Sequence, residues 1–549
     1  MSPPTVTTAS ELVRLRADDD GRGIVFEGRV WTWAEAVREA SARAGLFAEL
    51  REPGPFHVAV LLENSPEYLF ILMGAALGGA TVVGLNPSRR GDELAGDLHH
   101  TDCQLVITDS TQLHHLEGID LGLGDGRLLI ADSADYLAAV SGHADDGLPD
   151  TMPDPTDLFM LIFTSGSTGR PKAVRLTQGR AARSAARVPF SADDVLYSAM
   201  PLFHGNALNA AVFPAWACGS TIALRRKFSA SGFLPDIRES GATFFNSVGR
   251  AIAHIVATEP TASDRDHSLK YVLGPETSEP DKIEFTRRFG VPLFEGYGSS
   301  ENTIILLPRP DIPGALGEAQ QGEDIAVVSP EGVECPRARF DAEGRLLNAA
   351  EATGEIVGRN VAGRFEGYYN NDGAESERIR NGWYWSGDLA YRDPAGVFYF
   401  AGRSGDWLRV DQENFAAAPV DRILNRWEAA SGVAVYAVPD SRTADQVMAA
   451  IEMEHGRAFD PDDFAAFLAA QPDLGTKWAP RYVRIVESLP VTGTDKIDKT
   501  PLRSTRWDTV DPLWHRVGRS DEFVPMTKDD VARLYEEFET SGRSNLLQS

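Results

Sequence analysis

The sequence predicts an α/β protein with two domains, and three observations support that prediction. The chain has 549 residues, more than one compact core normally holds, so at least two domains are expected. Short apolar runs rich in β-branched residues alternate with helical patterns, an order typical of largely parallel sheets. The pattern restarts after "YFAGRSGD" (399–406), at a Gly-containing turn. We therefore expect a large N-terminal domain at 1–403 and a small C-terminal domain at 404–549.

The elements of the large domain follow from periodicity and length. Helices are predicted at 32–50 and 281–290, and strands at 57–63, 80–86, 104–109, 158–163 and 220–225. The uncharged run "YLFILMGAALGGATVVGL" (68–85) resembles a membrane span, but Gly78 and Gly79 divide it into a helix-like half and a strand-like half. We expect a buried helix followed by a buried strand.

The small domain begins with the same kinds of element. The segment "DRILNRWEAASGVAVYAVPD" (421–440) predicts a helix and then a strand, and "DDFAAFLAAQP" (462–472) predicts another helix. The tail from about Trp507 is charged and only weakly periodic. A polar linker rich in Pro, Gly and Asp is expected at 141–157.

Composition excludes several classes of partner. The net charge is −27 and the pI is about 4.8, so the surface repels nucleic acid and anionic membranes. Cys103, Cys218 and Cys335 are far apart in the sequence and form no CxxC motif, which argues against a disulfide framework or a zinc site. The first twenty or so residues contain no apolar signal core. We expect a cytoplasmic protein with no integral membrane association.

One loop predicts a phosphate-binding site. A buried strand at 158–163 runs into "TSGSTG" (164–169), whose backbone N–H groups and hydroxyls can converge on phosphate oxygens. Lys172 follows and adds a positive charge. The chain contains no Gly-Lys-Ser/Thr and no GxSxG, so this is neither a Walker loop nor a serine-hydrolase elbow.

Segments spread over more than half of the chain, taken in order, resemble the adenylate-forming enzymes: acyl-CoA synthetases, adenylation domains and luciferases. They are "FTSGSTGRPKAV" (163–174), "PLFHGNA" (201–207), "EGYGSSE" (295–301), "WYWSGDLAYRD" (383–393), "GRSGDWLRV" (402–410) and "LPVTGTDKIDKTPLR" (489–503). Ala173 replaces the final Gly of the family's phosphate loop. The hinge and the Thr-Gly-Thr-x-Lys segment are closest to the fatty-acid-transport-like and actinobacterial long-chain acyl-CoA ligases.

The resemblance implies an architecture and a reaction. The large domain would consist of stacked mixed sheets with helices, and the small α+β domain would turn on a flexible hinge at Gly405. The enzyme would be an ATP-dependent acyl-CoA ligase that uses ATP, Mg²⁺ and coenzyme A and forms an acyl-AMP intermediate. Its substrate would be a bulky or long apolar carboxylic acid, because the implied acyl pocket has small residues and no matched cation. The family also allows a homodimer.

The resemblance implies these nucleotide-site roles residue by residue. Glu301 would hold Mg²⁺, Asp388 the ribose hydroxyls, and Tyr297 would stack on adenine. Lys496 would bridge the carboxylate and the α-phosphate, with Lys499 as the competing lysine and a surface residue. The full implied set for the nucleotide is Thr164, Ser165, Gly166, Ser167, Thr168, Gly169, Lys172, Gly274, Pro275, Glu276, Glu295, Gly296, Tyr297, Gly298, Ser300, Asp388 and Arg403, with Lys496, His204, Glu301 and Thr168 as its catalytic residues.

The other two substrates have implied sites as well. His204 would be the gate between the nucleotide and the acyl group. The implied acyl-site residues are His204, Asn206, Ala207, Phe245, Asn246, Ser247, Val248, Gly249 and Gly274. The implied CoA-site residues are Asp411, Gln412, Glu413 and Trp478.

Two alternatives remain open. Gly405, Asp411 and Gln412 depart from the pattern of many relatives, so the enzyme could perform only adenylation or only thioester formation. A nucleotide-binding protein without catalysis is the second alternative, and the intact Lys172, Glu301, Asp388 and Lys496 argue against it. The pairs His99-His100 and His114-His115 lack acidic or Cys partners, so we do not predict a metal site there.

Overall fold

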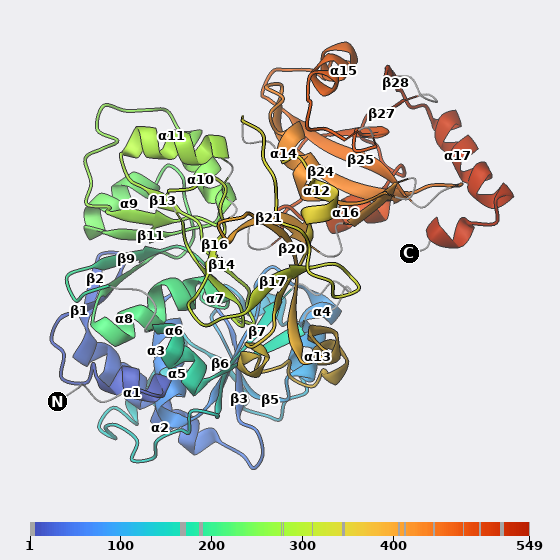
Figure 1. The fold of residues 1–549 in the computed structure, drawn as a ribbon. Helices are drawn as coiled ribbons and strands as arrows, with labels where there is room; N and C mark the ends of the chain where they lie inside the picture. The colour runs from blue at the N-terminus through green and yellow to red at the C-terminus, as the bar shows by residue number, and fades with distance from the viewer. Residues whose placement is uncertain are drawn as a thin grey trace. The chain divides into compact units, whose positions relative to one another are not determined.

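The computed structural model shows two compact units, which we describe one at a time (Figure 1). The first unit comprises Met1–Thr303 and Gly363–Glu377, and the second comprises Ile304–Ala362 and Arg378–Ser549. The structure describes residues 6–164, 172–185, 190–275, 277, 279–309, 311–342, 346–403, 407–410, 413–442, 445–475, 477–492, 496–516 and 521–547.

A six-stranded sheet forms the centre of the first unit's phosphate-loop region. Neighbouring strands are parallel except β7 and β8, which are antiparallel. In spatial order the strands are β6 (Leu128–Ile130), β5 (Cys103–Thr108), β3 (His57–Leu61), β4 (Thr81–Gly84), β7 (Leu158–Thr164) and β8 (Lys172–Thr177). The strands predicted at 57–63, 80–86, 104–109 and 158–163 are therefore confirmed.

The uncharged run at 68–85 forms a buried helix and then a buried strand, as predicted. Helix α3 (Pro66–Gly78) ends at Gly79, whose φ of 67° is left-handed, and the chain enters β4. Helix α3 packs against α2 (Trp33–Leu50). A Cβ at Gly74 would lie 2.8 Å from the carbonyl oxygen of Ala40, so glycine allows this close packing. Within the described residues, no helix is long and apolar enough to cross a membrane.

A second sheet in this unit has seven strands, all parallel except for the β1–β2 hairpin. The strand order is β13 (Leu293–Phe294), β12 (Tyr271–Leu273), β11 (Phe244–Asn246), β9 (Val195–Ser198), β10 (Thr221–Leu224), β1 (Arg22–Phe26) and β2 (Arg29–Thr32). The remaining elements are α1 (Ala9–Arg14), α4 (Gly91–His100), η1 (Leu113–His115), α5 (Ala134–Ser141), α6 (Gln178–Ala185), α7 (Gly205–Ala207), η2 (Leu208–Val212), α8 (Phe213–Cys218), α9 (Phe233–Ser240), α10 (Gly249–Val256), α11 (Glu279–Phe289) and β14 (Tyr297–Gly298).

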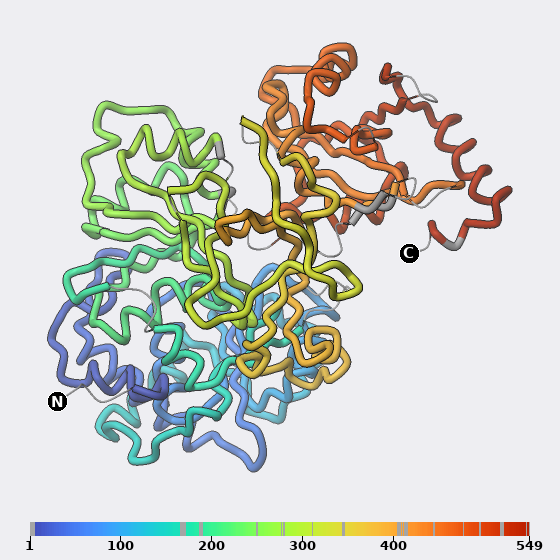
Figure 2. The backbone as a smooth tube through the Cα atoms, in the orientation of Figure 1, coloured from blue at the N-terminus to red at the C-terminus, as the bar shows by residue number. Residues whose placement is uncertain are grey.

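A segment from much later in the chain completes the first unit. Residues 363–377, here called the strap, pair with β8. In Figure 2 this gold segment lies beside the blue and cyan tube of earlier residues. The backbone N–H of Arg175 donates to Gly367 O (3.2 Å), and the N–H of Tyr369 donates to Ala173 O (2.8 Å). Glu366 accepts two further hydrogen bonds from Thr177. The strap thus pairs backbone groups that an edge strand would leave open.

The second unit begins with an antiparallel sheet. Its strand order is β15 (Ile305–Leu307), β16 (Gly317–Ala319), β21 (Val397–Arg403), β20 (Trp383–Arg392), β18 (Gly354–Gly358) and β17 (Ile325–Val328), and β19 (Ile379–Arg380) pairs with β20. The ribbon β22 (Trp407–Val410) and β23 (Glu413–Ala416) follows. Short helical elements in this part of the sequence are α12 (Ala349–Ala352), η3 (Ala362–Arg364) and α13 (Asp372–Arg378).

The C-terminal part of this unit is α+β, with a five-stranded sheet buried on both faces. One face carries a core with Trp427 and Phe464, and the other a core with Trp507 and Phe538. The strands are β24 (Ala430–Pro439), β25 (Asp445–Met453), β26 (Tyr482–Val486), β27 (Leu513–Arg516) and β28 (Phe523–Pro525), and the helices are α14 (Ala417–Leu424), α15 (Pro461–Ala469), α16 (Lys499–Thr505), α17 (Lys528–Thr540) and η5 (Ser544–Leu547).

Two features of this part differ from the sequence reading. Helix α14 starts before the predicted segment, and the tail forms β27, β28 and α17, elements that we did not predict. Helix α17, red in Figure 1, starts at a capping box between Thr527 and Asp530. The predicted domain boundary between residues 403 and 404 lies within the second unit, so it stays a prediction.

Candidate nucleotide and acyl site

The two ends of the predicted phosphate loop are fixed by strand pairing. Thr164 ends β7, Lys172 begins β8, and the two residues lie opposite each other in register. The Thr164 hydroxyl is 3.5 Å from the Lys172 carbonyl oxygen. The five loop residues predicted to bind phosphate lie outside the described residues: Ser165, Gly166, Ser167, Thr168 and Gly169.

Lys172 belongs to a buried, charged cluster. Its Nζ donates to Glu377 Oε2 at 3.0 Å and lies 5.4 Å from the ring centroid of Tyr368. The Tyr368 hydroxyl donates to Glu301 Oε1 at 2.6 Å. Lys172, Tyr368 and Glu301 are buried, with exposed fractions of 5%, 2% and 6%. The structure therefore brings together the predicted cation of the phosphate loop and the predicted magnesium carboxylate.

The loop that carries Glu301 is held on helix α6. The buried guanidinium of Arg180 donates to Ser300 O and, at 2.7 Å, to Arg175 O. Asn302 has a left-handed φ of 53°, and its side chain donates to Ser184 Oγ at 3.0 Å. These contacts fix Ser300 and Glu301 relative to β8.

The residues predicted around the adenine follow β12 and β13. The Gly274 N–H donates to Phe294 O (2.9 Å), and Thr277 Oγ1 donates to Gly274 O (2.7 Å). A Cβ at Gly274 would lie 3.0 Å from that hydroxyl oxygen, so the turn is tight there. Pro275 continues this turn, and Glu276 lies outside the described residues.

The Tyr297 segment is partly accessible. Tyr297 is buried in β14, whereas a Cβ at Gly298 would meet no atom of the described residues within 4 Å. Glu295 forms an ion pair with Lys282 (2.9 Å), and the position of Gly296 would also accept a Cβ without a close contact. The geometry leaves open space over the backbone beside Tyr297.

The segment with the predicted gate crosses the carboxyl ends of β3 and β4. Asn64 accepts from the Leu202 N–H (3.0 Å) and donates to Met200 O (2.9 Å). A Cβ at Gly84 would lie 2.8 Å from Phe203 Cβ, so glycine is needed for this approach. His204 is half-buried, precedes α7 and packs on Phe203 with ring centroids 4.8 Å apart.

Two predicted acyl-site residues contact each other through their carboxamides. Asn246 Nδ2 donates to Asn206 Oδ1 at 2.6 Å, and Asn246 is fully buried. Ala207 and Val248 are buried, and the Ser247 N–H donates to Leu273 O (2.8 Å). A π-helix, η2, follows α7, and such turns are frequent at functional sites.

Phe245 is not placed beside Asn206. It lies in the aromatic core under α9 and α11, with its ring 5.5 Å from Tyr197 and 4.9 Å from Phe233. Successive strand residues face opposite sides of a sheet, so Phe245 and Asn246 point apart. Gly249 begins α10, after Val248.

In the second unit, Asp388 lies in β20 opposite Arg403 in β21. The turn before it is tight: Gly387 has φ of 76°, and a Cβ there would lie 2.3 Å from Arg378 Nη1. The Gly387 N–H donates to Glu355 Oε1 at 2.7 Å. Burial raises the pKa of Glu355, and the Gly387 N–H and the nearby arginines oppose that rise.

The predicted hinge and CoA residues are only partly described. Gly405, Asp411 and Gln412 lie outside the described residues, and Glu413 starts β23 opposite Val410. Trp478 is buried and stacks on Phe415, with ring centroids 5.1 Å apart. Trp478 is thus part of the core of this unit.

The two C-terminal lysines have different surroundings. Lys496 is half-buried in a turn closed by a β-bridge between Val491 and Ile497, with the Thr492 N–H donating to Lys496 O at 2.7 Å. Lys499 begins α16, and its Nζ donates to Asp421 Oδ2 at 2.7 Å. The side chain of Lys499 is 15% exposed, so the expectation of a surface residue was wrong.

Sequence reasoning missed the residues that support the site. Tyr368, Glu377 and Arg180 were not predicted, although they contact predicted residues. The only local signal was the pair of tyrosines in the otherwise polar stretch "FEGYYNND" (365–372).

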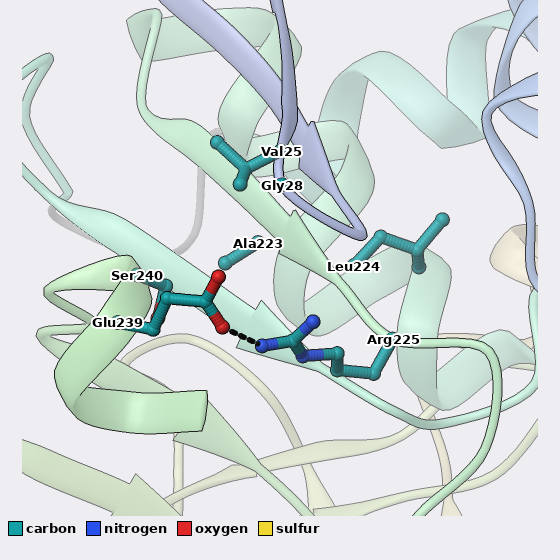
Figure 3. A pocket seen from close by; sticks show the side chains of 7 residues that line it. All are labelled: Val25, Gly28, Ala223, Leu224, Arg225, Glu239 and Ser240. Atoms are coloured by element: carbon teal, nitrogen blue, oxygen red, sulfur yellow. Dashed lines mark hydrogen bonds and ion pairs between the residues drawn. The ribbon is translucent and has the colours of Figure 1, made fainter. Parts of the chain in front are cut away.

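A small pocket elsewhere in the first unit contains none of the predicted site residues (Figure 3). The ion pair between Arg225 and Glu239 (2.7 Å) lies across it. Its lining residues are Val25, Gly28, Ala223, Leu224, Arg225, Glu239 and Ser240. In the described part of the chain, no group of three or more His, Cys, Asp or Glu residues could hold a metal ion by itself.

Two known proteins are similar to this chain over more than nine-tenths of its length. The chain is 51% identical over 549 residues to a steroid-22-oyl-CoA synthetase of Rhodococcus jostii (strain RHA1), covering 98% of this chain and 99% of that protein. It is 43% identical over 518 residues to the medium/long-chain-fatty-acid–CoA ligase FadD17 of Mycobacterium tuberculosis (strain ATCC 25618 / H37Rv), covering 93% and 99%.

Solved structures show the same fold. ATP-bound MatB from Rhodopseudomonas palustris superposes with a TM-score of 0.79 at 23% identity, over 91% of this chain and 99% of that one. The anthranilate CoA ligase AuaEII, in complex with anthranoyl-AMP, gives 0.78 at 20% identity, over 91% and 98%. The family described as AMP-binding enzyme matches residues 14–369. The chain therefore belongs to the AMP-binding enzymes.

Proposed function

We propose that this protein is an ATP-dependent acyl-CoA ligase that activates a bulky or long apolar carboxylic acid through acyl-AMP and transfers it to coenzyme A. The observation that carries the proposal is the 51% identity, over nearly the full length of both chains, to a steroid-22-oyl-CoA synthetase. A relative with 43% identity is named as a medium/long-chain-fatty-acid–CoA ligase. Both names describe large apolar acyl groups.

We further propose that the preferred acid carries a steroid-22-oyl group. Among the described residues predicted to line the acyl site, Asn206, Ala207, Ser247 and Val248 are small or uncharged, so none would attract a second carboxylate. A site without a fixed cation favours an apolar body with one acid group, because a second carboxylate would be desolvated without a partner. The fatty acid is the competing substrate class.

The nucleotide would bind between the phosphate loop and the Glu301 loop. Lys172 would neutralise the β- and γ-phosphates, together with Thr164 and the loop residues up to Gly169. Tyr297, Gly274, Pro275 and the glycines beside Tyr297 would hold the adenine. Asp388 would accept hydrogen bonds from the ribose hydroxyls, and Arg403 would lie next to it in the ladder.

The residues around Glu301 fit a bound Mg²⁺. Among the described residues linked to Lys172 there are two carboxylates, Glu301 and Glu377, for one ammonium, so a polyphosphate bound there would gain from additional positive charge. Mg²⁺ is usually held by one or two carboxylates and by substrate phosphates rather than by a cage of protein ligands. Bound there, Mg²⁺ would neutralise phosphate charge as pyrophosphate leaves. The chain's own part is to hold the Glu301 oxygens in place.

Lys496 would bring its ammonium to the reacting carboxylate and α-phosphate, and His204 would separate the nucleotide from the acyl site. In the first step the carboxylate oxygen attacks the α-phosphorus and pyrophosphate leaves. In the second step the CoA thiol would attack the acyl carbon and AMP would leave. Asp411, Gln412 and Glu413 remain the proposed CoA residues, and the buried Trp478 would support them from the core. Gly405 would be the hinge between the steps.

The test is a substrate panel with ATP, Mg²⁺ and CoA, analysed by mass. We expect a thioester with a steroid-22-oic acid at a higher kcat/KM than with palmitate, and little product with benzoate or malonate. If the fatty acid formed a thioester and the steroid acid did not, the preferred substrate would be a fatty acid. Absence of ATP-dependent thioester formation with every acid would overturn the proposal.

The half-reaction alternative can be separated on the same acid. Pyrophosphate exchange measures adenylation, and CoA-dependent consumption of supplied acyl-AMP measures transfer. The relatives named above are a CoA synthetase and a CoA ligase, so they give this alternative no support. We expect both partial reactions.

A further inference from the structure

We infer that Tyr368 is a positioning residue of the nucleotide site, which links the phosphate-loop cation to the metal-binding carboxylate. The inference rests on the proposed function and assigns a role to a residue outside the predicted motifs. Tyr368 contacts both charged groups: its hydroxyl donates to Glu301 Oε1 (2.6 Å), and its ring lies 5.4 Å from Lys172 Nζ.

The hydroxyl contact orients the carboxylate. An ionised carboxylate only accepts hydrogen bonds, and a tyrosine hydroxyl can donate one, so the contact matches the charged form of Glu301. Both groups are buried, which strengthens the bond and fixes the side-chain rotamer. A carboxylate held in this way loses less rotational freedom when it binds a cation.

The ring contact orients the ammonium. A cation within about 6 Å of an aromatic centroid is attracted to the ring face. Glu377 accepts a hydrogen bond from the same ammonium at 3.0 Å. A phosphate could replace the Glu377 carboxylate as the partner of Lys172, whereas the Tyr368 ring would stay in place. Tyr368 is the permanent partner, because its own position is fixed by the strap.

The strap holds Tyr368 through its backbone. The Tyr368 N–H donates to Glu375 Oε1 (2.8 Å), and Tyr368 forms an antiparallel bridge with Val174 of β8. Tyr369, the next residue, faces away: its hydroxyl donates to Asp102 Oδ2 (2.9 Å), and its ring packs edge-on against His57. One tyrosine therefore contacts the site while its neighbour anchors the strap.

Tyr369 supplies a matched control for a test of Tyr368. Tyr368 and Tyr369 both belong to the strap, and each has a hydroxyl that donates to one carboxylate elsewhere in the first unit. Tyr368→Phe and Tyr369→Phe each remove one of these hydroxyls. The first removes a contact to Glu301, and the second removes a contact remote from Lys172 and Glu301. If Tyr368 were only structural, the two variants would behave alike.

The experiment measures binding by calorimetry on the full-length protein, with ATP in excess Mg²⁺ and with ATP in EDTA. We expect Tyr368→Phe to weaken Mg-ATP binding by about tenfold, as for the loss of one hydrogen bond to a charged group. Its affinity for ATP in EDTA should change by less than about threefold, since the ring remains beside Lys172. Tyr369→Phe should match the wild type in both titrations, although its Tm should fall by about as much as the Tm of Tyr368→Phe.

A double-mutant cycle keeps the inference testable if either single variant loses stability. With Glu301→Gln as background, adding Tyr368→Phe should cost no further Mg-ATP affinity, because Tyr368 acts through Glu301. Equal Mg-ATP affinities for Tyr368→Phe and Tyr369→Phe, or an additive loss in the double variant, would overturn the inference. Failure of the wild type to bind Mg-ATP would instead overturn the proposed function.

Discussion

The two regions that carry the predicted lysines are built differently. Around Lys172, the buried residues Tyr368 and Glu301 and the more exposed Glu377 are linked by hydrogen-bond, ion-pair or cation–π contacts. Lys496 itself is half-buried, and the exposed residues on either side of its segment, Val491 and Ile497, form a β-bridge. The contacts of the first region join residues far apart in the sequence, whereas the bridge at the second joins residues close together in it.

The difference matches the tasks that we propose. A group that holds phosphates gains from a fixed position, because preorganised charge costs no reorganisation during the reaction. A lysine that takes part in only one of two steps has to leave the site. The described residues around Lys496 include the exposed Val491 and Ile497, so this segment has little packing to break when it moves. Lys499, three residues later, is held by Asp421 and could not move in this way without losing an ion pair.

Replacing Lys496 gives the largest expected effect. Lys496→Ala should slow adenylation by about 10³-fold, since it removes the charge that stabilises the pentavalent transition state. CoA transfer from supplied acyl-AMP should fall by less than about tenfold. Pyrophosphate release and thioester formation measure the two steps, and an equal loss in both would contradict the assigned role.

Lys499→Ala is the control for that variant. It breaks the half-buried contact with Asp421 and should lower the free energy of unfolding by about 2 kcal/mol. Adenylation by the folded protein should stay within a few-fold of the wild type. Loss of adenylation comparable to that of Lys496→Ala would exchange the roles of the two lysines.

Replacing Lys172 should weaken ATP binding more than it slows CoA transfer from supplied acyl-AMP. Lys172→Met keeps the apolar stem but removes the charge, and Glu377 loses the ammonium with which it pairs. We expect ATP affinity to fall by about 10²-fold, measured by calorimetry, with CoA transfer from supplied acyl-AMP less affected. A variant with wild-type ATP affinity would show that Lys172 does not contact phosphate.

The turn before Asp388 tests the second unit. Gly387→Ala forces a side chain into a left-handed conformation and onto Arg378, so it should raise the KM for ATP by about tenfold. Gly382→Ala is the matched control, because Gly382 has φ of 77° and nothing within 4 Å of its Cβ position. The difference between the variants isolates the Arg378 contact, and equal values would assign the whole effect to backbone strain.

The smallest expected effect is at Glu377. Its carboxylate pairs with Lys172 in competition with phosphate, so Glu377→Gln should lower the KM for ATP by about two- to threefold. The Glu377 side chain is 58% exposed, and the difference should therefore shrink as salt is raised to about 0.5 M. A higher KM in low salt would show that Glu377 orients Lys172 rather than competing for it.

Local patterns in the sequence were sufficient for much of the fold and for the predicted motifs. The division of the run at 68–85, the strand before the phosphate loop and its exit at Lys172 all followed from spacing and glycine placement. Thr527 and Asp530 show the converse: their capping box was readable, but the charged tail hid the start of α17. Strand parity would also have separated Phe245 from Asn246.

Contacts between distant residues could not be predicted in this way. Tyr368 lies 67 positions from Glu301 in the sequence, and Glu377 lies 205 positions from Lys172. No local period or turn signal relates such pairs, because the strap reaches β8 only after the chain has formed part of the second unit. The residues that support the site were therefore missed, while those in compact motifs were found.

Because the strap follows residues of the second unit in the sequence, the chain cannot be cut between its two units at a single position. A fragment that stops at residue 303 would expose the β8 edge as an open template for intermolecular pairing, and it would lack Tyr368 and Glu377. A fragment that continues to residue 377 would include residues 304–362 of the second unit, whose strands would lack their partners from residue 378 onward. Nascent chains would meet the same difficulty on the ribosome, where the first unit must wait for more than half of the protein to emerge.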